Sequence, residues 1–393
     1  MRVLLNGIPL LSPRSGVGNY VYFLGEALRR VGPEHEWMFH YLTFQSSMVR
    51  NLPSASFGKV RRQLRNVPGM YTAYRVALEL FFRVNTYRKN IDLYHETNYA
   101  PFPFRGPTVV TVYDLSFLYY PETHPKERVK FYERYFYPRL SLIRHFLAIS
   151  ESVKREMVKD LHIAADRITV TPLGLDAQYT PAAPGDVKTV TAKFGLTPGH
   201  YIISVGTKEP RKNLKRLLAA YAKLSPSLRE RFPLAVVGGA GWLFDDWKTL
   251  LSRWGLSNDV KTLGYVPQEH LPVLYSGATL LAYPSLYEGF GLPLLEAMGC
   301  GCPVLTSNVS SLPEVVGNAG VQVDPMDVDG LSAAMSRLLD DPAERERLRA
   351  LGLERAKGFG WDQCAALTLK GYAKAMGPSH PLPVHREPAA RGS

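Results

Sequence analysis

Short apolar runs alternate with amphipathic stretches along almost the whole chain of 393 residues. This alternation is typical of βαβ units, in which crossover helices join parallel strands. In the first half of the chain the predicted strands are Val3–Asn6, Leu93–His95, Thr108–Tyr113, Phe146–Ile149 and Ile168–Thr171. In the second half they are Tyr201–Val205, Leu234–Val237, Val260–Leu263, Thr279–Tyr283, Val304–Thr306 and Val321–Val323. We therefore expect an α/β protein with two parallel-sheet units.

The chain is long enough for two domains. Amphipathic stretches predict helices over Val17–Arg30, Glu127–Leu142 and Ser152–Lys159, the last with Ser150 as its N-cap. Residues 181–199 are rich in Pro, Gly and Ala and mark a boundary. We predict an N-terminal domain over 1–182 and a C-terminal domain over 190–365. Because ligands of parallel sheets bind outside the carboxyl ends of the strands, the site should lie in loops that face a cleft between the domains.

The net charge of +12 is concentrated in the first half, where residues 1–190 carry 25 Lys or Arg against 16 Asp or Glu. Such an excess favours an anionic partner, but none of the usual nucleic-acid motifs is present, so we expect no nucleic acid. The chain has three cysteines and no disulfide framework, which suits a reducing compartment; we interpret Cys300 and Cys302 as small buried residues, not metal ligands. No secretion signal or long apolar run is present, which predicts a cytoplasmic protein.

The segment Tyr283–Gly299 (YPSLYEGFGLPLLEAMG) carries the strongest chemical signal. A strand ends near Pro284, a glycine-punctuated loop follows, and a helix begins near Leu292. The glycines let the backbone approach a ligand closely, and the free N–H groups of a helix N-terminus suit a diphosphate. Glu288 lies in the loop and Glu296 lies about one turn inside the helix, on the order of 6 Å further on by helix rise. The two carboxylates can therefore accept hydrogen bonds from hydroxyls at opposite ends of one ligand. A sugar nucleotide has this layout; the alternative is a capping loop with two solvated glutamates.

This segment resembles the E-x7-E motif of family 4 glycosyltransferases, and the resemblance covers roughly residues 1–376. It implies the GT-B fold: two Rossmann-like parallel-sheet domains that face each other across a cleft. By the resemblance, Glu296 binds the ribose of a nucleotide-sugar donor and Glu288 binds the hydroxyls of the donor sugar. Backbone groups of four consecutive residues would line the sugar and phosphates: Gly289, Phe290, Gly291 and Leu292.

The loop Ser204–Asn213 (SVGTKEPRKN) follows the first predicted strand of the second half. Its paired cations, Arg211 and Lys212, can neutralise a diphosphate in the bound state and as it leaves; a solvated basic turn is the alternative. The loop, with Gly206 at its start, resembles the family's Gly-Arg…Lys donor-phosphate pair. Lys212 matches the lysine, whereas Thr207 stands where many members have the arginine, and we expect Arg211 to supply that charge.

Residues expected on the other wall of the cleft come from the first half. Gly16 and Gly18 resemble the family's N-terminal glycine loop, although a plain tight turn explains them nearly as well. His95, at the end of one strand, and Asp114 are candidates for contacts with the acceptor or the sugar. For His95, a hydrogen-bonded interior histidine is an equally good interpretation. Tyr113 and Asp114 end the next strand, where family members often have His-Asp or His-Gly, and that His commonly contacts the donor sugar.

Two further motifs complete the expected donor site. Gly264 and Tyr265 resemble the family loop that holds the nucleobase. The Asp327-Val328-Asp329 sequence matches a metal-binding pattern of another glycosyltransferase class, but helix capping explains it, so we expect no metal and no cofactor beyond the nucleotide-sugar co-substrate. The resemblance also predicts that the last helix, 362–376, crosses back to the first domain, and the Pro-rich residues 377–393 are expected to be disordered.

Residues 48–90 hold nine Lys or Arg and one acid, Glu79, interleaved with aromatic residues. A basic amphipathic helix can lie on an anionic membrane surface, which would suit a lipid-linked acceptor. The alternative is a solvated helix that packs its aromatic side chains inward. We therefore expect peripheral contact with the cytoplasmic face of an inner membrane.

The expected function is that of a retaining glycosyltransferase, which moves a hexose from a nucleotide sugar to a glycan or lipid-linked acceptor. A GDP-mannose-type donor is favoured by general similarity to bacterial polysaccharide mannosyltransferases, with UDP-glucose-type donors left open. A GT-B nucleotide-sugar epimerase and a non-catalytic nucleotide-sugar or glycan-binding protein remain as alternatives. A dehydrogenase is disfavoured because the glycine fingerprint of dinucleotide binding is incomplete.

Overall fold

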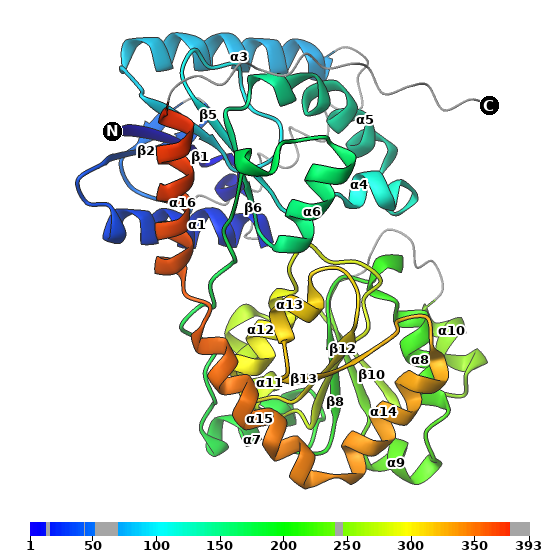
Figure 1. Cartoon of the computed structure of the whole chain (residues 1–393). Coiled ribbons are helices and arrows are strands. Elements are labelled where there is room, and N and C mark those ends of the chain that lie inside the picture. Colours follow the sequence, from blue (N-terminus) through cyan, green and yellow to red (C-terminus); the bar gives the residue numbers. More distant parts are fainter. Residues whose placement is uncertain (13–15, 43, 52–69, 240–246, 378–393) are drawn as a thin grey trace, which may run out of the picture.

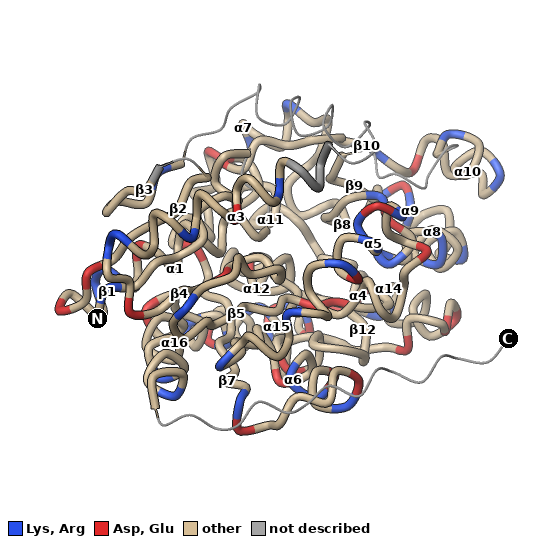
Figure 2. The backbone as a smooth tube through the Cα atoms, turned by 90° about the horizontal axis from the view of Figure 1, so that it is seen from above, with Lys and Arg blue, Asp and Glu red and all other residues tan. Residues whose placement is uncertain are grey.

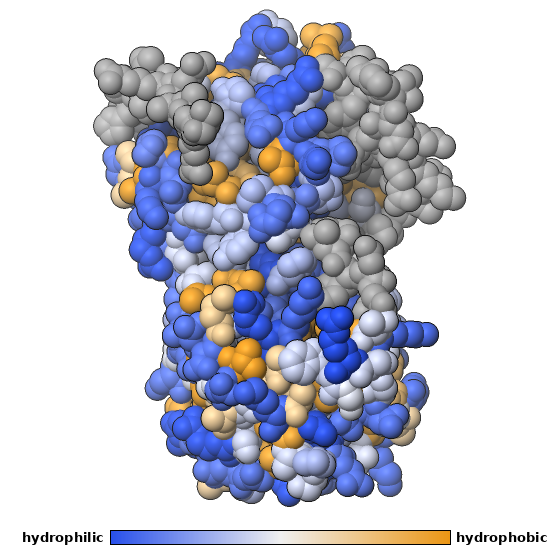
Figure 3. All heavy atoms as spheres, turned by 90° about the vertical axis from the view of Figure 1, so that its right-hand side faces the viewer, coloured by the Kyte–Doolittle hydropathy of each residue, from blue (hydrophilic) through white to orange (hydrophobic). Residues whose placement is uncertain are grey.

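The structure is a computed structural model that describes residues 1–12, 16–42, 44–51, 70–239 and 247–377. It consists of two α/β domains stacked one above the other (Figure 1). Seen from above, Lys and Arg positions and Asp and Glu positions alternate along the described backbone of both domains (Figure 2). The side shown in Figure 3 is mostly hydrophilic and narrows where the two domains meet.

The N-terminal domain is built on a seven-stranded sheet of order β3-β2-β1-β4-β5-β6-β7. Its strands are β1 (Arg2–Asn6), β2 (Glu36–Tyr41), β3 (Phe44–Ser46), β4 (Leu93–Glu96), β5 (Thr108–Val112), β6 (His145–Ala148) and β7 (Ile168–Val170). Its described helices are α1 (Gly16–Val31), α3 (Met70–Arg88), α4 (Ser116–Tyr119), α5 (Lys126–Tyr135) and α6 (Glu151–Asp160), with short 3-10 turns between them. Only β3 is antiparallel to its neighbour.

The C-terminal domain repeats this plan with six parallel strands in the order β10-β9-β8-β11-β12-β13. These are β8 (Ile202–Val205), β9 (Leu234–Val237), β10 (Val260–Gly264), β11 (Leu280–Tyr283), β12 (Val304–Ser307) and β13 (Gly320–Val323). Its described helices are α7 (Pro184–Lys193), α8 (Leu214–Ala222), α9 (Pro226–Arg231), α10 (Trp247–Arg253), α11 (Leu271–Gly277), α12 (Leu292–Gly299), α13 (Leu312–Val316), α14 (Val328–Asp340) and α15 (Pro342–Lys357). Both sheets are covered by helices, which is why the strands are runs of buried apolar residues and do not alternate.

Every predicted strand is present, with ends that differ from the prediction by at most one residue. Ser150 caps α6 as predicted, because its hydroxyl accepts a hydrogen bond from the backbone N–H of Val153 at 3.1 Å. The helix predicted over Glu127–Leu142 is too long. It gives way to a 3-10 turn (Tyr137–Leu142) at Pro138, which cannot donate the backbone hydrogen bond that an α-helix needs.

The boundary segment 181–199 is not a plain linker, since it contains helix α7. Pro184 lies at the start of α7, where proline is tolerated, and the helix packs against α11 of the C-terminal domain. A side chain at Gly277 would come within 2.8 Å of Val187, so a glycine on α11 allows the two helices to meet closely. The C-terminal domain therefore begins before the predicted residue 190.

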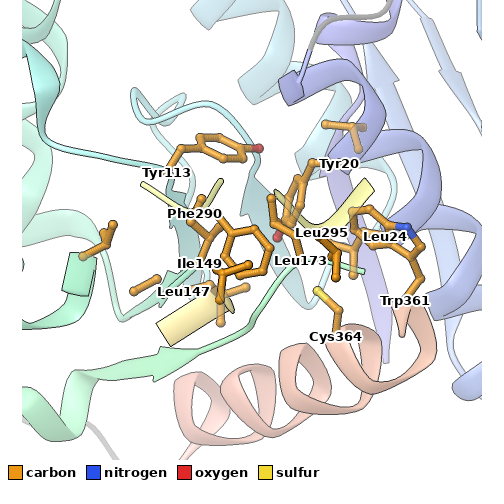
Figure 4. Packing of buried hydrophobic residues seen from close by; sticks show 14 of the residues in the cluster. Tyr20, Leu24, Tyr113, Leu147, Ile149, Leu173, Phe290, Leu295, Trp361 and Cys364 are labelled. Carbon is orange, nitrogen blue, oxygen red and sulfur yellow. The ribbon is translucent and has the colours of Figure 1, made fainter. Parts of the chain in front are cut away.

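The last described helix, α16 (Trp361–Met376), leaves the C-terminal domain and packs against α1 and the sheet of the N-terminal domain (Figure 1). A continuous apolar cluster joins the domains there, with Tyr113 and Ile149 from the first, Phe290 and Leu295 from the second, and Trp361 from α16 (Figure 4). This shared core holds the two sheets beside each other. The predicted disordered tail lies outside the described residues, apart from Gly377.

Candidate functional site

The carboxyl ends of β8 and β11 lie side by side in the centre of the C-terminal sheet. After β8 the chain turns to β9 and β10 on one side, and it returns to β11 on the other, so ligands are expected between these two strands. The loops that follow them are joined, because the Leu286 N–H donates to the Arg211 carbonyl at 2.8 Å. The Asn213 side chain also donates to the Pro284 carbonyl at 3.0 Å. The strand order therefore brings the loop Ser204–Asn213 and the segment Tyr283–Gly299 together.

Glu288 lies at the centre of these loops and is 7% exposed. Its Oε1 accepts from Lys212 Nζ at 2.6 Å and from the Tyr283 hydroxyl at 2.7 Å. Its Oε2 accepts from an Arg211 nitrogen at 3.1 Å. Burial alone would raise the pKa of Glu288, but the charges of Lys212 and Arg211 outweigh it and lower the pKa to about 2. Glu288 is thus an ionised hydrogen-bond acceptor held between two cations.

The two cations are themselves held in place. Arg211 also donates to the Tyr287 carbonyl at 3.0 Å and pairs with Glu209 at 3.4 Å. Its Nε is buried and has no hydrogen-bond partner among the described residues. A buried guanidinium N–H without a partner is costly unless a ligand completes it. An anionic ligand atom at this position would satisfy it.

The glycines of the Glu288 loop have distinct reasons to be glycine. A side chain at Gly289 would lie 1.8 Å from the Tyr113 carbonyl, so the loop touches the backbone of the other domain. Gly291 precedes α12 with a φ of +108°, a conformation that L side chains rarely adopt. Among the described residues no side chain caps α12, so the positive end of this helix is available to a ligand. Ser311 fixes the loop by donating to the Glu288 and Phe290 carbonyls at 2.8 and 2.9 Å.

Glu296 lies on α12 in different surroundings from Glu288. It is half-buried and accepts a hydrogen bond from the Tyr275 hydroxyl at 3.1 Å. Burial raises its pKa to about 7, although hydrogen bonds from Tyr275 and Tyr179 oppose the shift. The two acids of the motif therefore differ: Glu288 is ionised at any ordinary pH, and Glu296 changes charge near neutrality.

Three glycines lie at the carboxyl ends of neighbouring strands β8, β9 and β10. Gly206, Gly238 and Gly264 all have positive φ, and a side chain at Gly238 would lie 1.9 Å from the Gly206 carbonyl. Beside them, Thr207 is exposed and donates to Glu209 Oε1 at 2.6 Å, whereas the Tyr265 ring is 80% exposed. At this edge of the sheet the three glycines are half-buried and the Tyr265 side chain is exposed.

The expectation for His95 as a cleft residue is wrong in this structure. His95 is fully buried, and its ring nitrogens bond to the hydroxyls of Tyr372 and Thr111, both at 2.7 Å. Burial lowers its pKa to about 3. It is an interior histidine that ties α16 to the first sheet.

Tyr113 is also buried, and its hydroxyl donates to the Thr97 carbonyl at 2.6 Å, so only its backbone faces the other domain. Asp114 accepts from the Ser116 hydroxyl at 2.7 Å, and Ser116 in turn bonds to His124 Nε2 at 2.9 Å. Burial lowers the pKa of His124, which also feels the charges of Arg211 and Glu209 from the other domain. The structure therefore places a different imidazole, that of His124, on the first-domain wall; nothing in the sequence marked it.

Tyr287 links the two domains. Its hydroxyl donates to Glu156 Oε2 at 2.6 Å and accepts from the Leu115 N–H at 2.8 Å. Glu314 adds a second link by accepting two backbone N–H bonds, from Glu151 and Ser152, at the N-terminus of α6. The domains are therefore in contact at Tyr287 and Glu314 as well as at Gly289.

The remaining predicted residues lie at the edges of the site. Gly16 is exposed at the first residue of α1 and Gly18 is buried within that helix, whereas the preceding residues 13–15 lie outside the described part. Asp327 caps α14, because its carboxylate accepts a hydrogen bond from the Gly330 N–H at 2.8 Å. This is the capping role that we predicted for the Asp327-Val328-Asp329 sequence. No group of three or more potential metal ligands was found in the described ranges.

Two family models match the chain: Glycosyltransferase Family 4 over residues 14–179 and Glycosyl transferases group 1 over residues 189–355. The O-antigen chain mannosyltransferase B of Escherichia coli is 37% identical over 381 residues, which is 95% of this chain and 99% of the relative. A sucrose-phosphate synthase of Thermosynechococcus elongatus has the same fold, with a TM-score of 0.73, 22% identity and coverage of 95% and 99% of the two chains.

Anabaena HepE in complex with UDP and glucose is similar, with a TM-score of 0.71, 18% identity and coverage of 95% and 99%. These structural likenesses establish the fold, and the sequence relatives establish the family. The chain belongs to the family 4 glycosyltransferases with the GT-B fold and is an enzyme that transfers a sugar.

Proposed function

We propose that this enzyme transfers a mannosyl residue from a GDP-mannose-type donor to a polysaccharide or lipid-linked acceptor, with retention of anomeric configuration. The sugar assignment is supported by the relatives, which include mannosyltransferase B and the serotype-specific mannosyltransferase WbdA of Escherichia coli. The donor site is supported by one arrangement above all. Glu288 is ionised and pinned between Lys212 and Arg211 beside the uncapped start of α12.

In this proposal each group of the cluster has a separate task. Arg211, Lys212 and the start of α12 hold the diphosphate and stabilise the charge that develops as it leaves. Glu288 accepts hydrogen bonds from hydroxyls of the donor sugar, and Glu296 accepts them from the ribose. The acceptor hydroxyl attacks from the face that the diphosphate leaves, and the departing phosphate accepts its proton. Contact between the domains excludes water and so limits hydrolysis of the donor.

Calorimetric titration with GDP-, UDP- and dTDP-sugars, each with and without magnesium, tests the proposal. We expect tight binding of the GDP-sugar alone, unchanged by magnesium, since cationic side chains hold the diphosphate. Binding of only a UDP- or dTDP-sugar would overturn the donor assignment. Incubation with the donor alone separates a transferase from an epimerase, because only an epimerase converts it to a new nucleotide sugar.

Donor affinity should rise with pH through about 7, the pKa of Glu296. Ribose hydroxyls bind the ionised carboxylate better than the neutral acid, so binding must displace the proton that burial favours. Glu296→Gln should remove the rise. The measurement is calorimetry with GDP-mannose between about pH 6 and about pH 8, because its esterified phosphates do not titrate there.

The raised pKa of Glu296 also predicts how the stability of the folded protein depends on pH. The folded protein holds the Glu296 proton more tightly than the unfolded chain, so the free energy of unfolding should fall as pH rises from about 4.5 to about 7. Above that range Glu296 should add no further change to the free energy of unfolding.

In the calorimetric experiment, a wild-type donor affinity that does not change with pH contradicts the proposed contact of Glu296 with the ribose. An unchanged pH profile in Glu296→Gln contradicts it as well.

We also propose that α3 rests on an anionic membrane surface. Within the described residues it exposes five large apolar side chains: Val76, Leu80, Phe81, Val84 and Tyr87. Four of them recur every three or four residues and form one stripe along the helix. Arg83, Arg88 and Lys89 are exposed beside it. In Figure 1 this helix lies at the end of its domain farthest from the other domain.

Flotation with vesicles tests this surface. The double variant Leu80→Ser, Val84→Ser should lose most binding to anionic vesicles, roughly tenfold or more, because two of the inserted side chains become polar. Met326→Ser, which changes a similarly exposed apolar residue of the other domain, should bind like the wild type. Equal flotation of all three proteins, or binding to neutral vesicles alone, contradicts the assignment. No described helix is long and apolar enough to cross a membrane.

A further inference from the structure

A small cavity of about 70 Å³ lies at the carboxyl edge of the N-terminal sheet, between β1 and β4. Its polar lining comes from Asn6 at the end of β1, Glu96 at the end of β4, Asn98 in the next loop and Arg75 on α3. Its apolar walls include Phe102 and Phe131. We infer that this cavity binds one edge of a neutral sugar of the acceptor; the inference rests on the proposed function and adds to it the place where the acceptor is recognised.

The topology supports a ligand at this position. From β1 the chain runs to β2 and β3 on one side, and it returns to β4 on the other side of β1. In parallel sheets, ligands bind at this reversal, outside the carboxyl ends of the two strands. In the C-terminal domain the matching reversal lies between β8 and β11, where the Glu288 cluster lies. The cavity is therefore the counterpart of the donor site in the other sheet.

Glu96 gives the cavity a hydrogen-bonding centre. Its carboxylate is 1% exposed and accepts from Asn6 Nδ2 at 2.6 Å, the Tyr94 hydroxyl at 2.5 Å and the Asn98 N–H at 2.7 Å. An ionised carboxylate offers about four acceptor positions, so these three donors leave room for one ligand hydroxyl. The carboxylate cannot turn, because the three donors fix it.

The rest of the lining suits a sugar better than an anion or a lipid chain. The Arg75 guanidinium lies 4.2 Å from the centre of the Phe102 ring and bonds to the Ala100 carbonyl at 3.0 Å and to Glu79 at 2.9 Å. Glu79 also pairs with Arg139 at 2.7 Å, and the charge of Arg75 acts on Glu96 as well, where it opposes the rise in pKa that burial causes. The Arg75 guanidinium is therefore already held by acceptors of the protein. Amide and carboxylate groups can bind hydroxyls while the aromatic rings pack against C–H groups. The cavity holds on the order of five water molecules, which matches an edge of a sugar ring and not a whole lipid.

The position relative to the donor site is also suitable. The next strand, β5, leads to Tyr113, whose carbonyl contacts the Gly289 loop of the donor domain. Neighbouring strands lie about 4.8 Å apart, so the cavity between β1 and β4 is roughly 7–10 Å across the sheet from that contact. A short acceptor oligosaccharide spans this distance. The cavity would thus hold the acceptor while the hydroxyl that attacks reaches the donor.

Asn98→Ala provides the test, because the Asn98 side chain is exposed and the backbone N–H that holds Glu96 is kept. The full chain is titrated with a panel of neutral disaccharides, including mannobiose, in the presence of GDP. We expect the wild type to bind at least one of them at millimolar concentration, and Asn98→Ala to weaken that binding roughly tenfold, as expected for a lost hydrogen bond to the ligand. Asn258→Ala, an exposed residue of the other domain, is the control and should bind like the wild type.

A second variant, Asn6→Ala, should weaken saccharide binding in the same way and leave the affinity for GDP unchanged. If no disaccharide binds the wild type, or if both variants bind saccharide like the wild type, the cavity is not the acceptor site. If the wild type does not bind GDP, that result would instead contradict the proposed binding of a GDP-sugar donor. In kinetic assays, both variants should show a higher KM for the acceptor than the wild type and an unchanged KM for the donor.

Discussion

Glu288→Gln should reduce transfer by roughly 10²–10³-fold while nucleotide affinity stays the same or increases. The amide keeps the size of the side chain but has no charge and only one acceptor oxygen, so it holds the hydroxyls of the donor sugar poorly. In the wild type a diphosphate must compete with Glu288 for Lys212 and Arg211, which lie 2.6 and 3.1 Å from its oxygens. The amide removes that competition.

The measurement is kcat and KM for transfer, together with the Kd for GDP, in the variant and the wild type. Glu230→Gln, an exposed glutamate on α9, is the matched control and should leave both unchanged. A variant that loses GDP binding and turnover in parallel would indicate a structural role for Glu288 instead. Wild-type turnover in Glu288→Gln would rule out the proposed contact with the donor sugar.

The same substitution should also change acid stability. The pKa of Glu288 is lowered from 4.5 to about 2, so its pairing stabilises the folded wild type above about pH 4.5 and is lost as the pH falls toward 2. The shift corresponds to about 3 kcal/mol. Thermal unfolding of Glu288→Gln should therefore occur at a lower temperature than in the wild type at neutral pH, with a smaller difference at low pH.

Gly289→Ala is the second change with a large expected effect. An added methyl group would lie 1.8 Å from the Tyr113 carbonyl, so the two domains cannot keep their present contact. Because the contacting atom is backbone, it cannot move aside as a flexible side chain would. We expect transfer to fall by about 10²-fold or more, since a displacement of about 1 Å costs this much when two substrates must be aligned.

The Kd for GDP separates the two possible causes. The residues that we propose to bind the nucleotide lie within one domain, so GDP affinity should change little in Gly289→Ala, whereas small-angle scattering should show a more open molecule. Gly185→Ala is the control, because an added methyl group there meets nothing within 4 Å. A closed, fully active Gly289→Ala would show that the domain contact at this loop is not needed for transfer.

The sequence alone was sufficient to predict those parts of the structure that depend on interactions between residues close together in the chain. Short continuous apolar runs located the strands, because parallel strands that are covered by helices on both faces need apolar side chains on both sides. Ser150 was recognisable as a cap, since capping depends on bonds within one helical turn. The proposed donor-binding segments were also recognisable, because the glycines and acids of Tyr283–Gly299 and the cations of Ser204–Asn213 each follow a strand.

The sequence was a poorer guide where a residue's role depends on elements that are distant along the chain. His95 and Tyr113 follow or end strands, yet their side chains point into the protein, where α16 and Thr97 take up their polar atoms. His124 is linked to Asp114 through the Ser116 hydroxyl, and no local pattern in the sequence marks that link. The strands β2 and β3 and the helix within 181–199 were missed because their apolar patterns are interrupted by polar residues or by proline, and β3 has only three residues.

The sequence by itself therefore determined two βαβ units, their strands and the motif that carries Glu288, because local periodicity and turn chemistry are written in neighbouring residues. Only the tertiary structure decided that Glu288 lies between Arg211 and Lys212, that Gly289 meets Tyr113, and that Asn6 and Glu96 border one cavity. The physical reason is the order of the strands: a parallel sheet brings the carboxyl ends of distant segments together, and no local pattern records which ends become neighbours.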